Sequence, residues 1–260
     1  MVEVTLTNEV TLEVLGYQLS EKFERFYEEQ KEFLGLEEIV FVPMSEHPNP
    51  SCFLNAYGTT VLDKDRNILQ IYLDHKHLGL HPAAEQDYVA EIISVHEILH
   101  EWTKAKGYPE IYCDERISDD FLNLFHHQVI TRVMDQLEYD YSIPDRFVAK
   151  EFVEHNTALI EAEGLPEYKT GSVRFWVFTI KYAEYYFKFP PEYYEKARQL
   201  VSGTNMNLLL RSDQCVAVIQ ESKCWENPNK MFLAMKRVRD LLSLPSDSLD
   251  IKNPETGEWC

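Results

Sequence analysis

The sequence predicts an α+β fold with a mixed first half and a mostly helical second half. Two β-prone runs, joined by five polar residues, predict an antiparallel hairpin at Ala56–Leu62 and Ile68–Leu73. A long helical pattern follows at Pro82–Lys106 and begins with a proline, which is favoured at the first helical position. Beyond Pro144 the apolar and aromatic residues favour helices separated by turns that contain proline or glycine.

Three further elements complete the expected fold. Leu19–Leu34 carries aromatic residues at helical spacing with charges between them, which is typical of an amphipathic helix. Ile39–Val42 is a short apolar run that ends at a proline and is expected to be a strand. Ser118–Leu137 is expected to be a helix capped by Ser118, with two aspartates at its positive end.

Composition and charge exclude several classes of function. The chain has 260 residues, 45% of them hydrophobic, which is enough to build a core and argues against disorder. Its net charge of −19 argues against nucleic acid and anionic membranes as partners, because both require lysine and arginine. No apolar run reaches 18 residues and no secretory signal is visible. Five scattered cysteines suit reduced thiols in a cytoplasmic protein.

One segment carries a chemical signature, the pattern His-Glu-x-x-His at His96–His100 inside the long predicted helix. Residues four apart lie on one helical face, so His96 and His100 can both reach one Zn²⁺. Glu97 lies about 100° round the helix, where it can reach a water on the metal without being a ligand. Zinc lowers the pKa of such a water toward about 7, and Glu97 is placed to take its proton.

This segment resembles the metal-binding helix of the zincin metallopeptidases. The resemblance covers about residues 39–137 and implies zinc ligation by His96 and His100, with Glu97 as general base. It also implies that Ile68–Leu73 is an edge strand lining the substrate cleft. Residues 1–140 are then a zincin-like catalytic region, and residues 141–260 are a helical region that completes or covers the cleft.

The third zinc ligand is left open by the sequence. The metzincin pattern requires a glycine at position 103 and a histidine at position 106, where this chain has Thr103 and Lys106. A gluzincin-like arrangement takes the ligand from a following helix, and the helix expected at Ser118–Leu137 offers His126 and His127. Acidic alternatives are Glu115, Asp119 and Asp135.

The sequence therefore predicts a zinc-dependent metallopeptidase acting on a peptide or protein substrate. The alternatives are a zincin-fold regulatory or partner-binding protein with metal but little turnover, and a metal-free helical protein with an accidental motif. A tyrosine, histidine or arginine that stabilises the oxyanion is expected, and the sequence does not choose among the 15 tyrosines; four of the candidates are Tyr139, Tyr141, Tyr182 and Tyr185. Three further histidines, interpreted as parts of a solvated loop, precede the motif helix: His75, His77 and His81.

Overall fold

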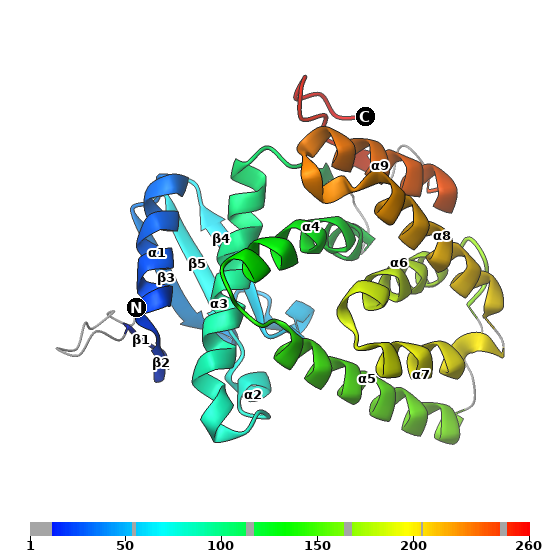
Figure 1. Ribbon diagram of the computed structural model, residues 1–260, viewed down its shortest axis with the longest axis horizontal. Helices are drawn as coiled ribbons and strands as arrows, with labels where there is room; N and C mark the ends of the chain where they lie inside the picture. The colour runs from blue at the N-terminus through cyan, green and yellow to red at the C-terminus, as the bar shows by residue number, and fades with distance from the viewer. Residues whose placement is uncertain (1–11, 54–55, 113–116, 164–167, 204, 245–248) are drawn as a thin grey trace. The chain divides into compact units, whose positions relative to one another are not determined.

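The computed structural model describes residues 12–53, 56–112, 117–163, 168–203, 205–244 and 249–260 (Figure 1). The protein has an α+β fold, mostly helical with small sheets, as the sequence predicts. The chain forms two units. The first contains residues 1–105 and 137–140, and the second contains residues 106–136 and 141–260. Residues 106–136 thus belong to the second unit, whereas the sequence interpretation placed them in the first region.

The first unit is built around a three-stranded sheet with the order β3-β5-β4. Strand β5 pairs with β3 in parallel and with β4 in antiparallel fashion, so the predicted hairpin is confirmed. The elements of this unit are β1 (Leu12–Val14), β2 (Tyr17–Leu19), α1 (Glu21–Leu34), β3 (Glu38–Pro43), β4 (Gly58–Asp63), β5 (Ile68–Leu73), α2 (His75–Leu78) and α3 (Ala83–Ala105), with two 3₁₀ turns at Met44–Glu46 and Pro50–Phe53.

The expected edge position of Ile68–Leu73 is wrong. This segment is β5, the central strand, with a hydrogen-bonded neighbour on each side. Its alternating side chains Leu69, Ile71 and Leu73 are fully buried, which suits a strand in the middle of a sheet. Among the described residues, the antiparallel strand β4 is an edge of this sheet.

One face of the sheet is covered by α1 and α3. Residues paired across neighbouring strands point to the same face, so Phe41 of β3 shares a face with Ile71 of β5. The rings of Phe23 and Tyr27 on α1 lie against Phe41, with ring centroids 6.2 and 6.5 Å away. Helix α3 meets the same face at Gly58, the first residue of β4. Burial of each large apolar side chain here contributes about 1.5–3 kcal/mol.

Helix α3 is buried without interruption from Val89 to Leu99. The residues expected on its buried face are Ile92, Val95, Ile98, Leu99 and Trp102; the first four are buried and Trp102 is half-buried. Ser94 and Glu97, outside that face, are buried as well. The polar part of the segment His96–His100 therefore lies inside the protein and not on a solvated helix surface.

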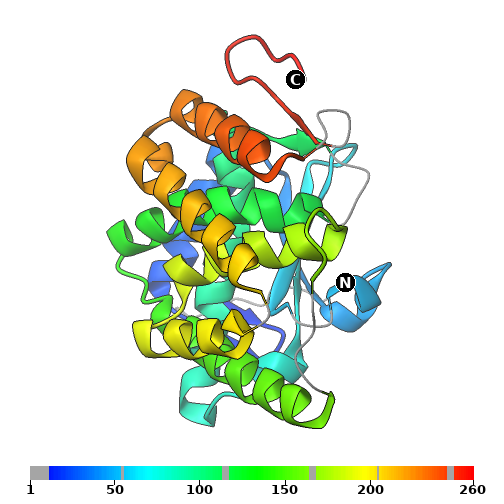
Figure 2. The same cartoon turned by 90° about the vertical axis from the view of Figure 1, so that its right-hand side faces the viewer.

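The second unit is a set of helices with one small two-stranded sheet. Helix α6 packs against both α4 and α8, while α5 lies beside α7 and α8 beside α9 (Figure 2). Its elements are β6 (Ile111–Tyr112), α4 (Ile117–Gln136), α5 (Ser142–Glu163), α6 (Val173–Lys188), α7 (Pro191–Ser202), α8 (Met206–Ser222), a 3₁₀ turn at Cys224–Glu226, α9 (Pro228–Leu242) and β7 (Asp250–Ile251). None of the helices in the described part of the chain is long and apolar enough to pass through a bilayer.

Candidate metal centre

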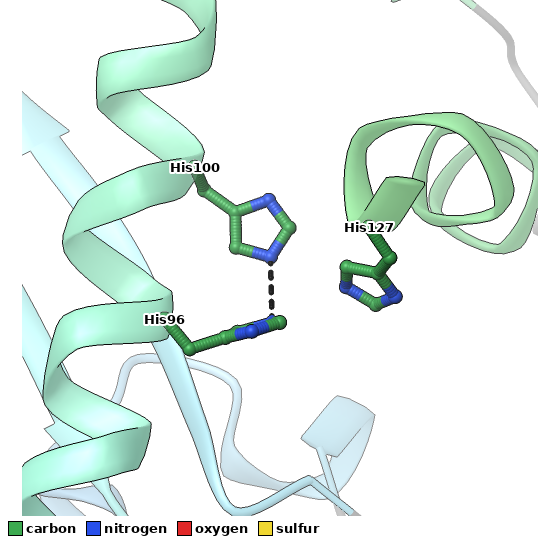
Figure 3. A group of neighbouring side chains, drawn as sticks. All are labelled: His96, His100 and His127. Atoms are coloured by element: carbon green, nitrogen blue, oxygen red, sulfur yellow. Dashed lines mark hydrogen bonds between the residues drawn. The ribbon is translucent and has the colours of Figure 1, made fainter. Parts of the chain in front are cut away.

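His96 and His100 point toward one another from successive turns of α3 (Figure 3). Their Nε2 atoms are 3.2 Å apart and the two rings meet edge to face. The two rings are within hydrogen-bond distance, and two nitrogens bound to one tetrahedral Zn²⁺ at about 2.0–2.1 Å would lie about 3.3 Å apart, so the spacing also fits two ligands of one ion. His96 is buried and His100 is half-buried.

His127 of α4 supplies a third imidazole to this group (Figure 3). One ring nitrogen from each of His96, His100 and His127 lies within 4.8 Å of the others. Imidazole nitrogens suit zinc, copper, iron and nickel better than they suit calcium or magnesium. The three side chains could therefore hold a metal ion.

The ring of His127 is oriented by Glu184 of α6. His127 Nδ1 lies 2.8 Å from Glu184 Oε1, and both side chains are buried. Because an ionised carboxylate only accepts hydrogen bonds, Nδ1 is the donor and Nε2 carries the lone pair that a metal requires. Lys188, one turn further along α6, lies 3.3 Å from the same carboxylate oxygen.

The charges around His127 keep its imidazole neutral. Burial lowers the pKa of His127, Lys188 lowers it further, and the hydrogen bond with Glu184 offsets only part of this. Burial alone would raise the pKa of Glu184, but Lys188 and His127 outweigh it and lower that pKa to about 2. A neutral imidazole bound to an ionised carboxylate is the state in which a histidine ligates a metal.

Two further acidic side chains of the second unit lie near these charges. Burial raises the pKa of Asp120 to about 6, although the Lys181 ammonium lies 3.5 Å from its carboxylate. Burial raises the pKa of Asp145 to about 7; Glu184 raises it further and Lys188 opposes the shift. Protons are therefore retained by carboxyl groups in this part of the helical unit under conditions where exposed aspartates have lost them.

Glu97 lies beside His96 on α3, and only 8% of its surface is exposed. Two other acidic residues are buried in this helix: Glu101, whose carboxylate lies 2.5 Å from the Lys104 ammonium, and Glu91, which accepts hydrogen bonds from the backbone and hydroxyl of Ser20, each 2.7 Å long. Glu91 thereby stabilises the start of α1, for which Ser20 is the N-cap. Glu91 and Glu101 thus have other partners, Ser20 and Lys104, and Glu97 directly follows His96 in the chain.

The remaining candidates for the third ligand lie elsewhere. His126 is fully buried, but its Nε2 donates to the carbonyl of Pro109 at 2.9 Å, and it is not part of the three-imidazole group. Asp119 and Asp135 are exposed. Glu115 lies outside the described residues.

The three histidines before α3 have separate partners. His75 Nδ1 lies 3.1 Å from the Tyr17 hydroxyl, and His81 Nε2 lies 2.8 Å from the Tyr57 hydroxyl. His77 Nδ1 donates to the Asp74 carboxylate at 2.6 Å. His75 is exposed, as expected of a solvated segment, but His75 and His77 belong to the short helix α2 and His81 is buried, so the expected solvated loop is only partly correct.

The tyrosines considered for oxyanion stabilisation are mostly in packed surroundings. Tyr182 is buried and its hydroxyl donates to the carbonyl of Ala197 at 3.0 Å. Tyr139 is buried beneath the Lys22 ammonium, 3.8 Å from the ring centre. Tyr185 stacks on Phe189 with centroids 4.3 Å apart. Tyr141 is half-buried.

The chain matches no family model, no curated protein and no solved structure. Its function must therefore be inferred from the chemistry of its own side chains.

Sequence reasoning missed Glu184 and Gly58. Glu184 lies on α6, 57 positions after His127, in a segment whose dense aromatic residues predict packed helix faces and, as an alternative, an aromatic substrate cleft. Its one sequence signal was an acidic residue among aromatic neighbours. Gly58 approaches Glu97 closely, and its signal was a glycine at the start of a β-prone run.

We expect Glu184→Ala to weaken zinc affinity about 10- to 100-fold, because the carboxylate orients and polarises His127. Glu184→Gln keeps an acceptor for Nδ1 and should lose less. Affinity is measured by competition with a chelating dye, with Glu192→Ala, an exposed change on α7, as control. Unchanged affinity in a folded Glu184→Ala protein would show that the hydrogen bond does not act on the metal.

We expect Asp145→Asn to stabilise the protein at pH 8 by about 1–2 kcal/mol, with the gain shrinking toward pH 4. The folded wild type holds the Asp145 proton up to about pH 7, while the unfolded chain releases it near 4, so wild-type stability falls as the pH rises through this window. Urea unfolding at both pH values measures the effect. The exposed Asp135→Asn is the control, and an equal gain at pH 4 and pH 8 contradicts the titration of Asp145.

Proposed function

We propose that this protein is a zinc-dependent metallopeptidase. The observation that carries the proposal is the group of His96, His100 and His127, with Glu97 directly beside the first of them. Catalytic zinc sites use three protein ligands and leave one position of the tetrahedron for water or substrate. The three imidazoles match the number and type of ligands in this pattern. The carboxylate of Glu97, the residue after His96, is the candidate for the base.

The proposed roles follow from where each side chain lies. The three imidazoles hold the ion, and Glu184 keeps His127 in the tautomer that presents Nε2. When bound, Zn²⁺ supplies a Lewis acid for the peptide carbonyl and a water acidic enough to react near neutral pH. Glu97 accepts the proton of that water and delivers it to the leaving amine.

The order of elements supports assignment to the zincins, as a gluzincin-like member. The segment His96–His100 lies on a helix that packs on a small sheet, and the third imidazole comes from the next long helix, α4. A peptide or protein is the proposed substrate. Free thiols at Cys215 and Cys224 support the proposed cytoplasmic location, because thiols persist in reducing compartments.

The metal site is tested first. We expect the wild type, purified without chelator, to contain about one zinc per chain by elemental analysis. His127→Gln should lower this content strongly, whereas His126→Gln, the adjacent buried histidine, should keep it because glutamine can still donate to the Pro109 carbonyl. Equal metal content in the two variants, or none in the wild type, contradicts the proposed ligand set.

Catalysis is tested with a defined mixture of synthetic peptides whose products are identified by mass spectrometry. We expect cleavage that a chelator abolishes and zinc restores. Glu97→Gln should lower kcat/KM about 10²- to 10⁴-fold while keeping the metal, because it removes the base and no ligand. The control is Glu85→Gln, an exposed change in the first turn of the same helix. Bound zinc without cleavage would favour a regulatory or partner-binding protein.

A further inference from the structure

Strand β4 begins with a glycine at the point where α3 packs on the sheet. A Cβ atom placed on Gly58 would lie 2.9 Å from Ile93 Cγ2, 3.1 Å from Glu97 Cγ and 3.2 Å from the carbonyl oxygen of Tyr72. The first distance is shorter than real Cβ contacts, and the other two are shorter than most. The absence of a side chain at residue 58 is therefore what lets α3 lie this close to the strand.

The stem of Glu97 consequently rests against the backbone of β4. Only 8% of Glu97 is exposed, so its methylene groups have little freedom to move away from that backbone. Ile93, one turn earlier on α3, is also buried and meets Gly58 from the neighbouring position. The strand thus forms one wall of the space that the Glu97 side chain occupies.

This wall is held in place by the residues around it. Gly58 pairs with Leu73 at the end of the β4–β5 ladder. The carbonyl of the preceding residue, Tyr57, accepts a hydrogen bond from the Asp74 backbone at 2.9 Å. The buried hydroxyl of Tyr57 lies 2.8 Å from His81 Nε2. The start of β4 is therefore fixed by a backbone and a side-chain contact as well as by its place in the sheet.

We propose that Gly58 is a positioning residue for Glu97, fixing the carboxylate at the distance from the metal that proton transfer requires; this rests on the proposed peptidase function. A general base must lie within hydrogen-bond reach of the proton it takes. Displacement of a catalytic group by about 1 Å can cost up to about 10²-fold in rate. A side chain at residue 58 would press on Ile93 and Glu97 of α3, so that the stem of Glu97 would have to move by a few tenths of an ångström.

The test compares Gly58→Ala with the wild type on the best-cleaved peptide of the synthetic mixture. We expect kcat to fall up to about 10-fold, with KM within about twofold and zinc content unchanged, since the atoms nearest to the new methyl group belong to Ile93, Glu97 and Tyr72. The control is Gly35→Ala, which strains a left-handed residue at the end of α1 in open surroundings and should keep kcat.

A second comparison separates positioning from general loss of structure. In a Glu97→Gln background the change Gly58→Ala should have almost no further effect on the residual rate, because the group it displaces no longer acts as a base. Tyr57→Phe provides a milder variant, should Gly58→Ala not fold. It loosens the start of β4 without adding atoms, and we expect kcat to fall about two- to fivefold.

The outcomes are distinguishable. If the wild type cleaves no peptide, the proposed function fails and the role of Gly58 fails with it. If the wild type cleaves and Glu97→Gln does not, but a folded, zinc-loaded Gly58→Ala protein keeps its kcat, only the role of Gly58 is overturned. An equal fall in rate with and without Glu97 also overturns it, as does an unchanged kcat in Tyr57→Phe.

Discussion

The complete burial of the middle of α3 is the constraint on which the rest of the first unit depends. A helix buried on every side can contain polar side chains only if each has a partner inside the protein. Ser94 and Thr103 donate hydrogen bonds to carbonyls of their own helix. Glu91 accepts a hydrogen bond from the backbone of Ser20, the N-cap residue of α1. His96 faces His100 across one turn. Each of these polar groups thus has a partner inside the protein, and Glu91 also ties α3 to the start of α1.

In the second unit, buried polar side chains find their partners in ion pairs. Buried Glu184 is stabilised by two donors, His127 and Lys188, and so remains ionised where burial alone would protonate it. Asp145 and Asp120 have less compensation, and their carboxyl groups retain protons to higher pH. Buried ion pairs of this kind stabilise a fold weakly because desolvation offsets their attraction. Glu184 and Lys188 act on His127 instead: the carboxylate orients its ring, and the ammonium helps to keep the ring neutral.

Strand β4 links the fold to the proposed chemistry. The sheet can place α3 close to an edge strand only where that strand lacks a side chain, and Gly58 meets this condition. The three buried leucine and isoleucine side chains of β5 require neighbours on both sides and put this strand in the centre. Strands β3 and β5 pair in parallel and are far apart in the sequence, so no local sequence pattern predicts this pairing.

The sequence by itself determined the α+β class, the β4–β5 hairpin, the extent of α3 and the placement of His96, Glu97 and His100 on one helix, because each depends on a periodicity over a few residues. Only the tertiary structure decided which of two adjacent histidines joins them. His126 and His127 are both buried, and their side chains point about 100° apart around the helix. His126 therefore contacts the Pro109 carbonyl, whereas His127 contacts Glu184. Glu184 and Gly58 could not be assigned from sequence either. Their roles arise from contacts between segments far apart along the chain, which no local spacing records.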